Sequence, residues 1–181
     1  MKLAVLFPGM GYHMDKPLLY YAKDLAAVCG YEIMAADYGE LPRGVKGSPE
    51  KMKDAFEKAL KNSLESLAEV KGENYKELLF ISKSIGTAVS SAVADKLQLK
   101  TKNIYFTPVG ETFLFPLQKG IAFHGTADTW VDTKTVQTGC ETYGISLYIT
   151  EGVNHSMEND DTIANIRVLE QIMKQVKQYI E

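Results

Sequence analysis

The stretch LLFISKSIG, residues 78–86, decides how this chain is expected to fold. Its first four residues form a continuous apolar run, which is typical of a strand buried on both faces of a sheet. Small residues follow at Ser82, Ser84 and Gly86, and residues 85–97 then favour a helix. The stretch therefore predicts a strand, a sharp turn and a helix, with Ser84 in the turn at one edge of the sheet.

Short apolar runs alternate with longer amphipathic segments on both sides of this stretch. The expected strands cover residues 3–7, 31–36, 78–81, 104–107, 121–123 and 145–149, and the expected helices cover 18–29, 49–71, 85–97, 131–143 and 163–180. Asp15 is the expected N-cap of the first helix and Ser48 that of the second, while Gly72 is expected to end the second helix. Residues 37–48 are expected to form a loop. This alternation predicts an α/β fold, in which about six mostly parallel strands lie between two layers of helices.

The composition of the chain limits the classes of protein to consider. Its 181 residues suit one domain, which we expect to span residues 1–181, and its formal net charge of −3 gives no electrostatic reason to expect nucleic acid. Cys29 and Cys140 are too few for a disulfide framework and are expected to be small apolar residues in a reducing compartment. The apolar run at residues 3–7 is too short for a signal peptide, and no run approaches the roughly 18 apolar residues of a membrane span. We therefore expect a cytoplasmic protein that does not bind membranes.

Ser84 is the candidate nucleophile. A turn directly after a strand lifts the serine hydroxyl above the sheet edge, and small residues two positions before and after it let strand and helix pack closely. The usual pattern is G-x-S-x-G, and Ser82 replaces its first glycine here. The N–H of Ile85 would face a developing oxyanion from the N-terminal end of a helix. The alternative is that Ser82 or Ser84 only caps that helix.

Asp128 and His155 are the candidate acid and base. Asp128 follows the strand expected at 121–123, where a carboxylate could orient a histidine and stabilise its imidazolium. His155 lies on the loop after the strand expected at 145–149, where a base could lean over the nucleophile. The order Ser84, Asp128, His155, each after a different strand, is the order of a catalytic triad in one hydrolase architecture.

Other residues compete for these roles. Asp132 is a second acid, but it is expected in the first turn of a helix, and Asp128 itself could merely cap a turn. His124 is placed at a strand end, where its ring is expected to pack or to form a structural hydrogen bond. His13 follows the first strand and could line the site.

Three segments resemble the α/β-hydrolase superfamily: the serine turn, the His124-Gly125-x-x-Asp128 strand end and the Asn154-His155-Ser156 loop. The likeness covers essentially the whole chain and is closest to the small, lidless, dienelactone-hydrolase-like members. It implies a three-layer αβα sandwich with the strand order 2-1-3-4-5-6. It also implies that no lid domain is present, because only residues 108–119 separate the fourth and fifth strands.

The resemblance further implies that the loop after the first strand supplies a second oxyanion N–H. Met10 is our candidate for that donor, with Ile85 as its partner, although Gly11 or Tyr12 could serve instead of Met10. The alternative is a glycine turn with no catalytic task. We expect a small to medium apolar group of the substrate to bind against five aromatic and apolar residues: Tyr12, Phe113, Phe115, Trp130 and Met157. The alternative is that these side chains only cover the end of the sheet.

We expect no cofactor and no metal. Gly9-Met10-Gly11 resembles the start of the dinucleotide fingerprint G-x-G-x-x-G, but Met14 replaces the third glycine. The three histidines lie on separate segments, with neither H-E-x-x-H nor C-x-x-C spacing.

The sequence predicts a serine esterase that acts on a small-molecule ester through an acyl-enzyme. Thioesterases, lactonases, peptidases and acyltransferases use the same triad, and the sequence does not separate them. A non-catalytic binding protein built on the same fold is the alternative from another class.

Overall fold

A computed structural model describes residues 1–181 except Arg43 and Lys46. Both positions fall in the segment 37–48 that was expected to be a loop, so for them this expectation lies outside the described residues.

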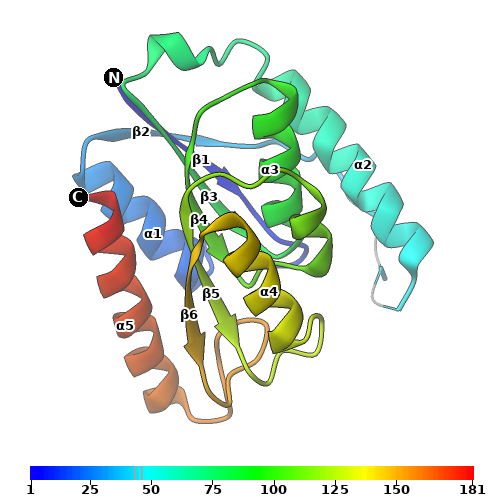
Figure 1. The fold of residues 1–181 in the computed structure, drawn as a ribbon, viewed down its shortest axis with the longest axis vertical. Coiled ribbons are helices and arrows are strands. Elements are labelled where there is room, and N and C mark those ends of the chain that lie inside the picture. Colours follow the sequence, from blue (N-terminus) through cyan, green and yellow to red (C-terminus); the bar gives the residue numbers. More distant parts are fainter. Residues whose placement is uncertain (43, 46) are drawn as a thin grey trace.

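The described residues form one six-stranded parallel sheet (Figure 1). Its strands are β1 (Lys2–Phe7), β2 (Tyr31–Ala35), β3 (Glu77–Lys83), β4 (Lys102–Phe106), β5 (Gly120–Gly125) and β6 (Ser146–Thr150). The strand order is β2-β1-β3-β4-β5-β6, which confirms the predicted order. β1 pairs with β3 up to Phe7 and Ser82, so the end of the first strand lies beside the serine turn.

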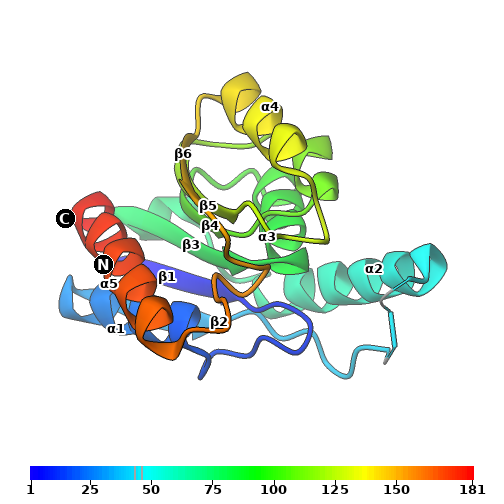
Figure 2. The same ribbon diagram turned by 90° about the horizontal axis from the view of Figure 1, so that it is seen from below.

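Helices cover both faces of the sheet, as Figures 1 and 2 show. One layer holds α1 (Pro17–Val28) and α5 (Thr162–Ile180), and the other holds α2 (Pro49–Ser66), α3 (Ile85–Lys96) and α4 (Thr133–Tyr143). Each face has its own apolar core, because successive strand residues point to opposite sides. Leu6 and Ile81 belong to the core under α1 and α5, whereas Val5 and Phe80 belong to the core on the other face.

Three predicted helix boundaries differ from the structure. Asp15 is not the N-cap of α1, because Pro17 occupies the first helical position and makes Lys16 the cap. α2 ends at Ser66 rather than just before Gly72, which instead begins the short 3₁₀ helix η1 (Gly72–Asn74). Asp132 is the N-cap of α4 and not a residue of its first turn. Ser48 caps α2 as predicted and accepts a hydrogen bond from the Lys51 N–H.

The connection between β4 and β5 contains no inserted domain. All of its residues are described, and its one regular element is the 3₁₀ helix η2 (Gly110–Leu114). The predicted lidless architecture is therefore confirmed. In the part of the chain that the structure describes, we find no helix with the length and apolar character needed to cross a membrane.

Candidate active site

Ser84 lies in the turn between β3 and α3 and has an unusual backbone conformation. Its φ is 56° and its ψ is −127°, a region that costs a residue with a side chain about 1–3 kcal/mol. Hydrogen bonds hold the turn on both sides: the Ser84 N–H donates to the Phe106 carbonyl at 3.0 Å, and the Ser84 carbonyl accepts from the Thr87 N–H at 2.8 Å. The turn therefore fixes the serine at the carboxyl edge of the sheet.

The residues two positions from Ser84 explain how strand and helix fit together. A Cβ atom on Gly86 would lie 2.2 Å from the Phe7 carbonyl oxygen and 2.6 Å from that of Pro8. Only glycine fits there, because both obstacles are backbone atoms. Ser82, which replaces the first glycine of the usual pattern, is fully buried and donates its hydroxyl to the Ile104 carbonyl at 3.1 Å. The departure from the pattern is thus accommodated by a hydrogen bond to β4.

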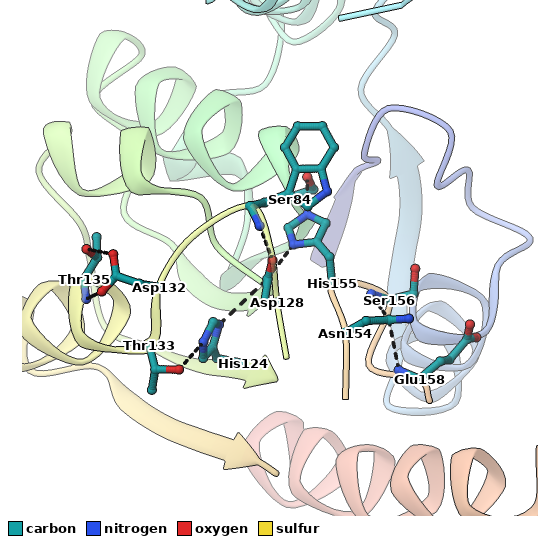
Figure 3. Close-up of polar contacts among 11 residues, drawn as sticks. Ser84, His124, Asp128, Asp132, Thr133, Thr135, Asn154, His155, Ser156 and Glu158 are labelled. Atoms are coloured by element: carbon teal, nitrogen blue, oxygen red, sulfur yellow. Dashed lines mark hydrogen bonds and ion pairs between the residues drawn. The ribbon is translucent and has the colours of Figure 1, made fainter. Parts of the chain in front are cut away.

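The structure brings Ser84, His155 and Asp128 into one hydrogen-bonded chain (Figure 3). The Nε2 atom of His155 lies 2.7 Å from the Ser84 Oγ, and its Nδ1 atom lies 2.6 Å from the Asp128 Oδ2. A carboxylate at Nδ1 favours the tautomer that carries its hydrogen there, which leaves Nε2 free to accept the serine proton. The three side chains are therefore arranged for proton transfer from Ser84 to His155.

The electrostatic surroundings favour a neutral histidine beside an ionised carboxylate. Burial lowers the pKa of His155 below its ordinary value, and the charge of Lys83 lowers it further, although the bond to Asp128 opposes both. Burial raises the pKa of Asp128, but the hydrogen bonds from His155 and from the Trp130 N–H outweigh it and bring this pKa below its usual value. His155 can therefore accept a proton near neutral pH.

The loop that carries His155 is fixed to the sheet. The Asn154 Oδ1 accepts from the Ser156 N–H at 2.8 Å, and the Asn154 N–H donates to the Glu158 carbonyl at 2.8 Å. At the base of the loop, a Cβ atom on Gly125 would lie 2.2 Å from the Val153 carbonyl oxygen. Because Gly125 has no side chain, the end of β5 can approach this loop closely. The close approach brings His155 next to Asp128.

Asp132 and His124, the competing acid and histidine, do not belong to the hydrogen-bonded chain from Ser84 through His155 to Asp128 (Figure 3). The Asp132 carboxylate accepts from the Thr135 N–H at 2.9 Å and caps α4. His124 is fully buried, with its Nε2 3.0 Å from the Thr133 Oγ1 and its Nδ1 3.9 Å from the Asp128 Oδ2. It therefore lies behind the carboxylate and not beside the serine.

Ser84 opens on a cavity of about 280 Å³. Of the residues expected to bind substrate, Tyr12 and Trp130 line it, and the Trp130 ring lies 5.6 Å from the His155 ring. Phe115 lines a neighbouring groove. Phe113 packs on Gly139 of α4, and Met157 is buried in the core under α1 and α5. The sequence thus located part of the cavity wall.

The cavity wall also includes five residues that the sequence analysis did not assign to it: Met52, Lys83, Val109, Glu111 and Ser156. Lys83 is the variable residue before the serine in G-x-S-x-G, where the pattern carries no expectation. Met52 comes from α2 and Glu111 from η2, and no local signal connects those segments to Ser84.

The loop after β1 narrows the choice of an oxyanion donor. The Tyr12 N–H donates to the Gly9 carbonyl at 3.2 Å, so it is already occupied. In the described part of the chain, no acceptor is found for the N–H groups of Met10, Gly11 and Ile85, and all three residues line the cavity. Met10 and Gly11 therefore remain the candidates to act with Ile85.

In the described residues, the thiols form no disulfide and the acidic side chains form no metal-binding cluster. Both cysteines are free, and burial raises the pKa of Cys140 to about 12, which suits an unreactive thiol. The described residues include no group of three or more His, Cys, Asp or Glu side chains arranged to hold a metal ion.

Solved structures provide the comparison with known proteins, since neither a protein-family model nor a curated protein matches this sequence. XC6422 from Xanthomonas campestris, an α/β serine hydrolase without a lid, has a TM-score of 0.70 and 16% identity over 99% of this chain and 80% of that chain. Est1E from Butyrivibrio proteoclasticus with bound ferulic acid has a TM-score of 0.72 and 13% identity over 99% and 88%. The esterase Pf2001 from Pyrococcus furiosus has a TM-score of 0.66 and 12% identity over 99% and 84%. The chain therefore has the fold of the small, lidless α/β hydrolases.

Proposed function

We propose that this chain is a serine hydrolase that cleaves carboxylic esters, with Ser84 as nucleophile, His155 as base and Asp128 as its orienting acid. The hydrogen-bonded chain from the Ser84 Oγ through His155 to Asp128, at the wall of a cavity, carries the proposal. The strained backbone of Ser84 supports it, because such strain persists where the surrounding structure holds a functional group in place.

The reaction proceeds by acyl transfer to water. As the Ser84 Oγ bonds to the carbonyl carbon, its proton passes to the His155 Nε2 and the carbonyl oxygen becomes an oxyanion. Collapse of this intermediate breaks the bond to the alcohol oxygen, which takes the proton from His155 and leaves as the free alcohol. Water, deprotonated by His155, then attacks the acyl-enzyme and releases the acid, and the proton returns to Ser84.

Two backbone N–H groups stabilise the oxyanion in this proposal. Ile85 supplies one from the N-terminal end of α3, and Met10 supplies the other, with Gly11 as the alternative donor. The loss of one such donor typically costs about 2.7–4 kcal/mol of transition-state stabilisation.

The choice of an ester as substrate rests on the proteins with similar structures, because the fold alone does not specify a substrate class. Est1E binds ferulic acid, and Pf2001 is an esterase. Thioesters, lactones and amides react through the same groups, so a panel of these four substrate classes is the measurement that separates them. We expect the highest kcat/KM with esters, and a clear preference for another class would replace this part of the proposal.

Labelling with a fluorophosphonate, read by intact-protein mass spectrometry, tests the nucleophile. We expect one adduct on the wild type and none on Ser84→Ala. Ser156→Ala is the matched control, because Ser156 also lines the cavity but takes no part in the hydrogen-bonded chain. An unlabelled wild type would favour a non-catalytic binding protein on this fold, whereas equal labelling of Ser84→Ala would show that another residue is the reactive nucleophile.

A further inference from the structure

An apolar groove of about 460 Å³ lies between the N-terminal half of α2 and η2. Its volume is in the range of small-molecule sites. The wall includes Met52, Phe56, Leu114 and Phe115, and the rings of Phe56 and Phe115 stack with their centroids 5.6 Å apart. Leu114 is 78% exposed, so the groove presents a large apolar side chain to the solvent.

The groove adjoins the cavity at Ser84. Met52 and Glu111 line both, so the two spaces share a wall formed by α2 and η2. A group bonded to the Ser84 Oγ would enter the groove by passing Met52 and Glu111. His155 and Ser156, by contrast, belong to the connection between β6 and α5.

We propose that the groove binds the acyl chain of the substrate and that this chain is an uncharged alkyl chain of medium length. The inference rests on the proposed ester hydrolysis at Ser84. The leaving alcohol oxygen must come within reach of the His155 Nε2, so the alcohol lies toward the β6–α5 connection. The acyl chain then points to the side of the cavity formed by Met52 and Glu111, where the groove begins.

The charges on the groove favour an uncharged chain. Lys53 and Glu111 are the ionisable residues among its described walls, and the Lys53 Nζ lies 3.7 Å from the Glu57 carboxylate. Glu111 lines both the groove and the cavity, so this acidic residue stands at their junction. It repels an acyl chain that ends in a carboxylate and leaves an alkyl chain unaffected.

Two ester series separate the acyl side from the alcohol side. The first compares p-nitrophenyl octanoate with p-nitrophenyl acetate, and the second compares octyl acetate with ethyl acetate, all below their solubility limits. A buried methylene is worth up to about fourfold in binding. We therefore expect kcat/KM for the octanoate to exceed that for the acetate at least about tenfold, with no comparable gain in the alcohol series.

A variant with a matched control tests whether the groove itself is responsible. Leu114→Asp puts a charge on the groove at an exposed position, and we expect it to lower the octanoate-to-acetate ratio of kcat/KM about tenfold. Val28→Asp makes the same change at a residue of α1 that is 87% exposed and outside the groove, and we expect it to keep the wild-type ratio.

The outcomes distinguish the inference from the proposed function. If the acetate is hydrolysed in a Ser84-dependent way but the chain preference is absent, lies on the alcohol side, or survives Leu114→Asp, the groove assignment is wrong and the hydrolase proposal stands. If no ester of either series is hydrolysed and no fluorophosphonate labelling occurs, both are overturned.

Discussion

The Nζ of Lys83 lies 4.9 Å from the centroid of the Tyr12 ring, and both residues line the cavity at Ser84. Lys83 is 1% exposed, and within the described residues no carboxylate lies within 4 Å of its Nζ. Burial lowers the pKa of this lysine to about 7, although the charges of Asp128 and Glu158 act to raise it. The face of the Tyr12 ring therefore stabilises the Lys83 ammonium when it carries its charge.

Replacing Lys83 by Met is expected to change how stability depends on pH. Between about pH 7 and the ordinary lysine pKa of 10.5, the unfolded chain binds a proton that the folded chain does not, so the stability of the wild type rises with pH in this window. Lys83→Met should therefore exceed the wild type by about 2–4 kcal/mol at pH 6 and lose this advantage as the pH approaches 10.5. Urea denaturation at pH 6 and pH 10 measures the difference, with the exposed Lys53→Met as control. An advantage of the same size at both pH values would contradict the buried-charge explanation.

The activity of the wild type is expected to fall in acid with a midpoint below pH 6.5. His155 must be neutral to act as base, and burial, followed by the charge of Lys83, lowers its pKa. Lys83→Met removes that charge and should move the midpoint of the kcat/KM profile to higher pH. The profile of ester hydrolysis between pH 4.5 and 8 gives both midpoints. A midpoint above 6.5 in the wild type, or a shift to lower pH in the variant, would count against this view of His155.

Asp128→Asn is expected to reduce kcat by about 10³–10⁴-fold, because an amide does not hold the His155 tautomer that accepts the serine proton. Asp132→Asn is the matched change at the competing acid. Because Asp132 caps α4, its replacement should cost at most about 1 kcal/mol of stability and leave the kinetics near those of the wild type. Steady-state kinetics and thermal unfolding of both variants decide which carboxylate acts, and a large loss in Asp132→Asn alone would reverse the assignment.

Gly86→Ala is expected to destabilise the fold by about 1–3 kcal/mol or more, since the new methyl group would meet the Phe7 and Pro8 carbonyl oxygens. Gly110→Ala provides the control, because a Cβ there meets no atom within 4 Å. Urea denaturation measures both stabilities. The fluorophosphonate reaction of the folded fraction of Gly86→Ala should also slow, because the turn that carries Ser84 has to move. Equal stability of the two variants would show that the packing at Gly86 is looser than described.

The parts of the molecule that a local pattern determines were predictable. Strands buried on both faces, such as β3, contain a continuous apolar run, and the alternation of such runs with amphipathic helices predicted the fold class. The prediction that Asp15 caps α1 was wrong because α1 begins at Pro17. The N-cap is the residue before it, Lys16, which is one position after Asp15.

The cavity wall was harder to predict, because it depends on contacts between distant segments. Met52 reaches the cavity only through the packing of α2 on the sheet, and no periodicity in its own helix shows this. Phe113 is aromatic and close in sequence to Phe115, yet its ring packs on Gly139 because η2 turns it toward α4. Hydrophobic side chains near a site carry the same sequence signal whether they face a ligand or a neighbouring helix.

The parallel sheet also sets the order in which the site can be assembled during translation. Of the segments that build the site, the loop with Met10 after β1 is synthesised first, Ser84 after β3 comes next, and His155 follows only after β6. Because domains generally fold as units, a nascent chain that ends at Thr150 contains Ser84 but lacks the proposed base. In the proposed mechanism, the base is therefore synthesised after both the nucleophile and the oxyanion donors.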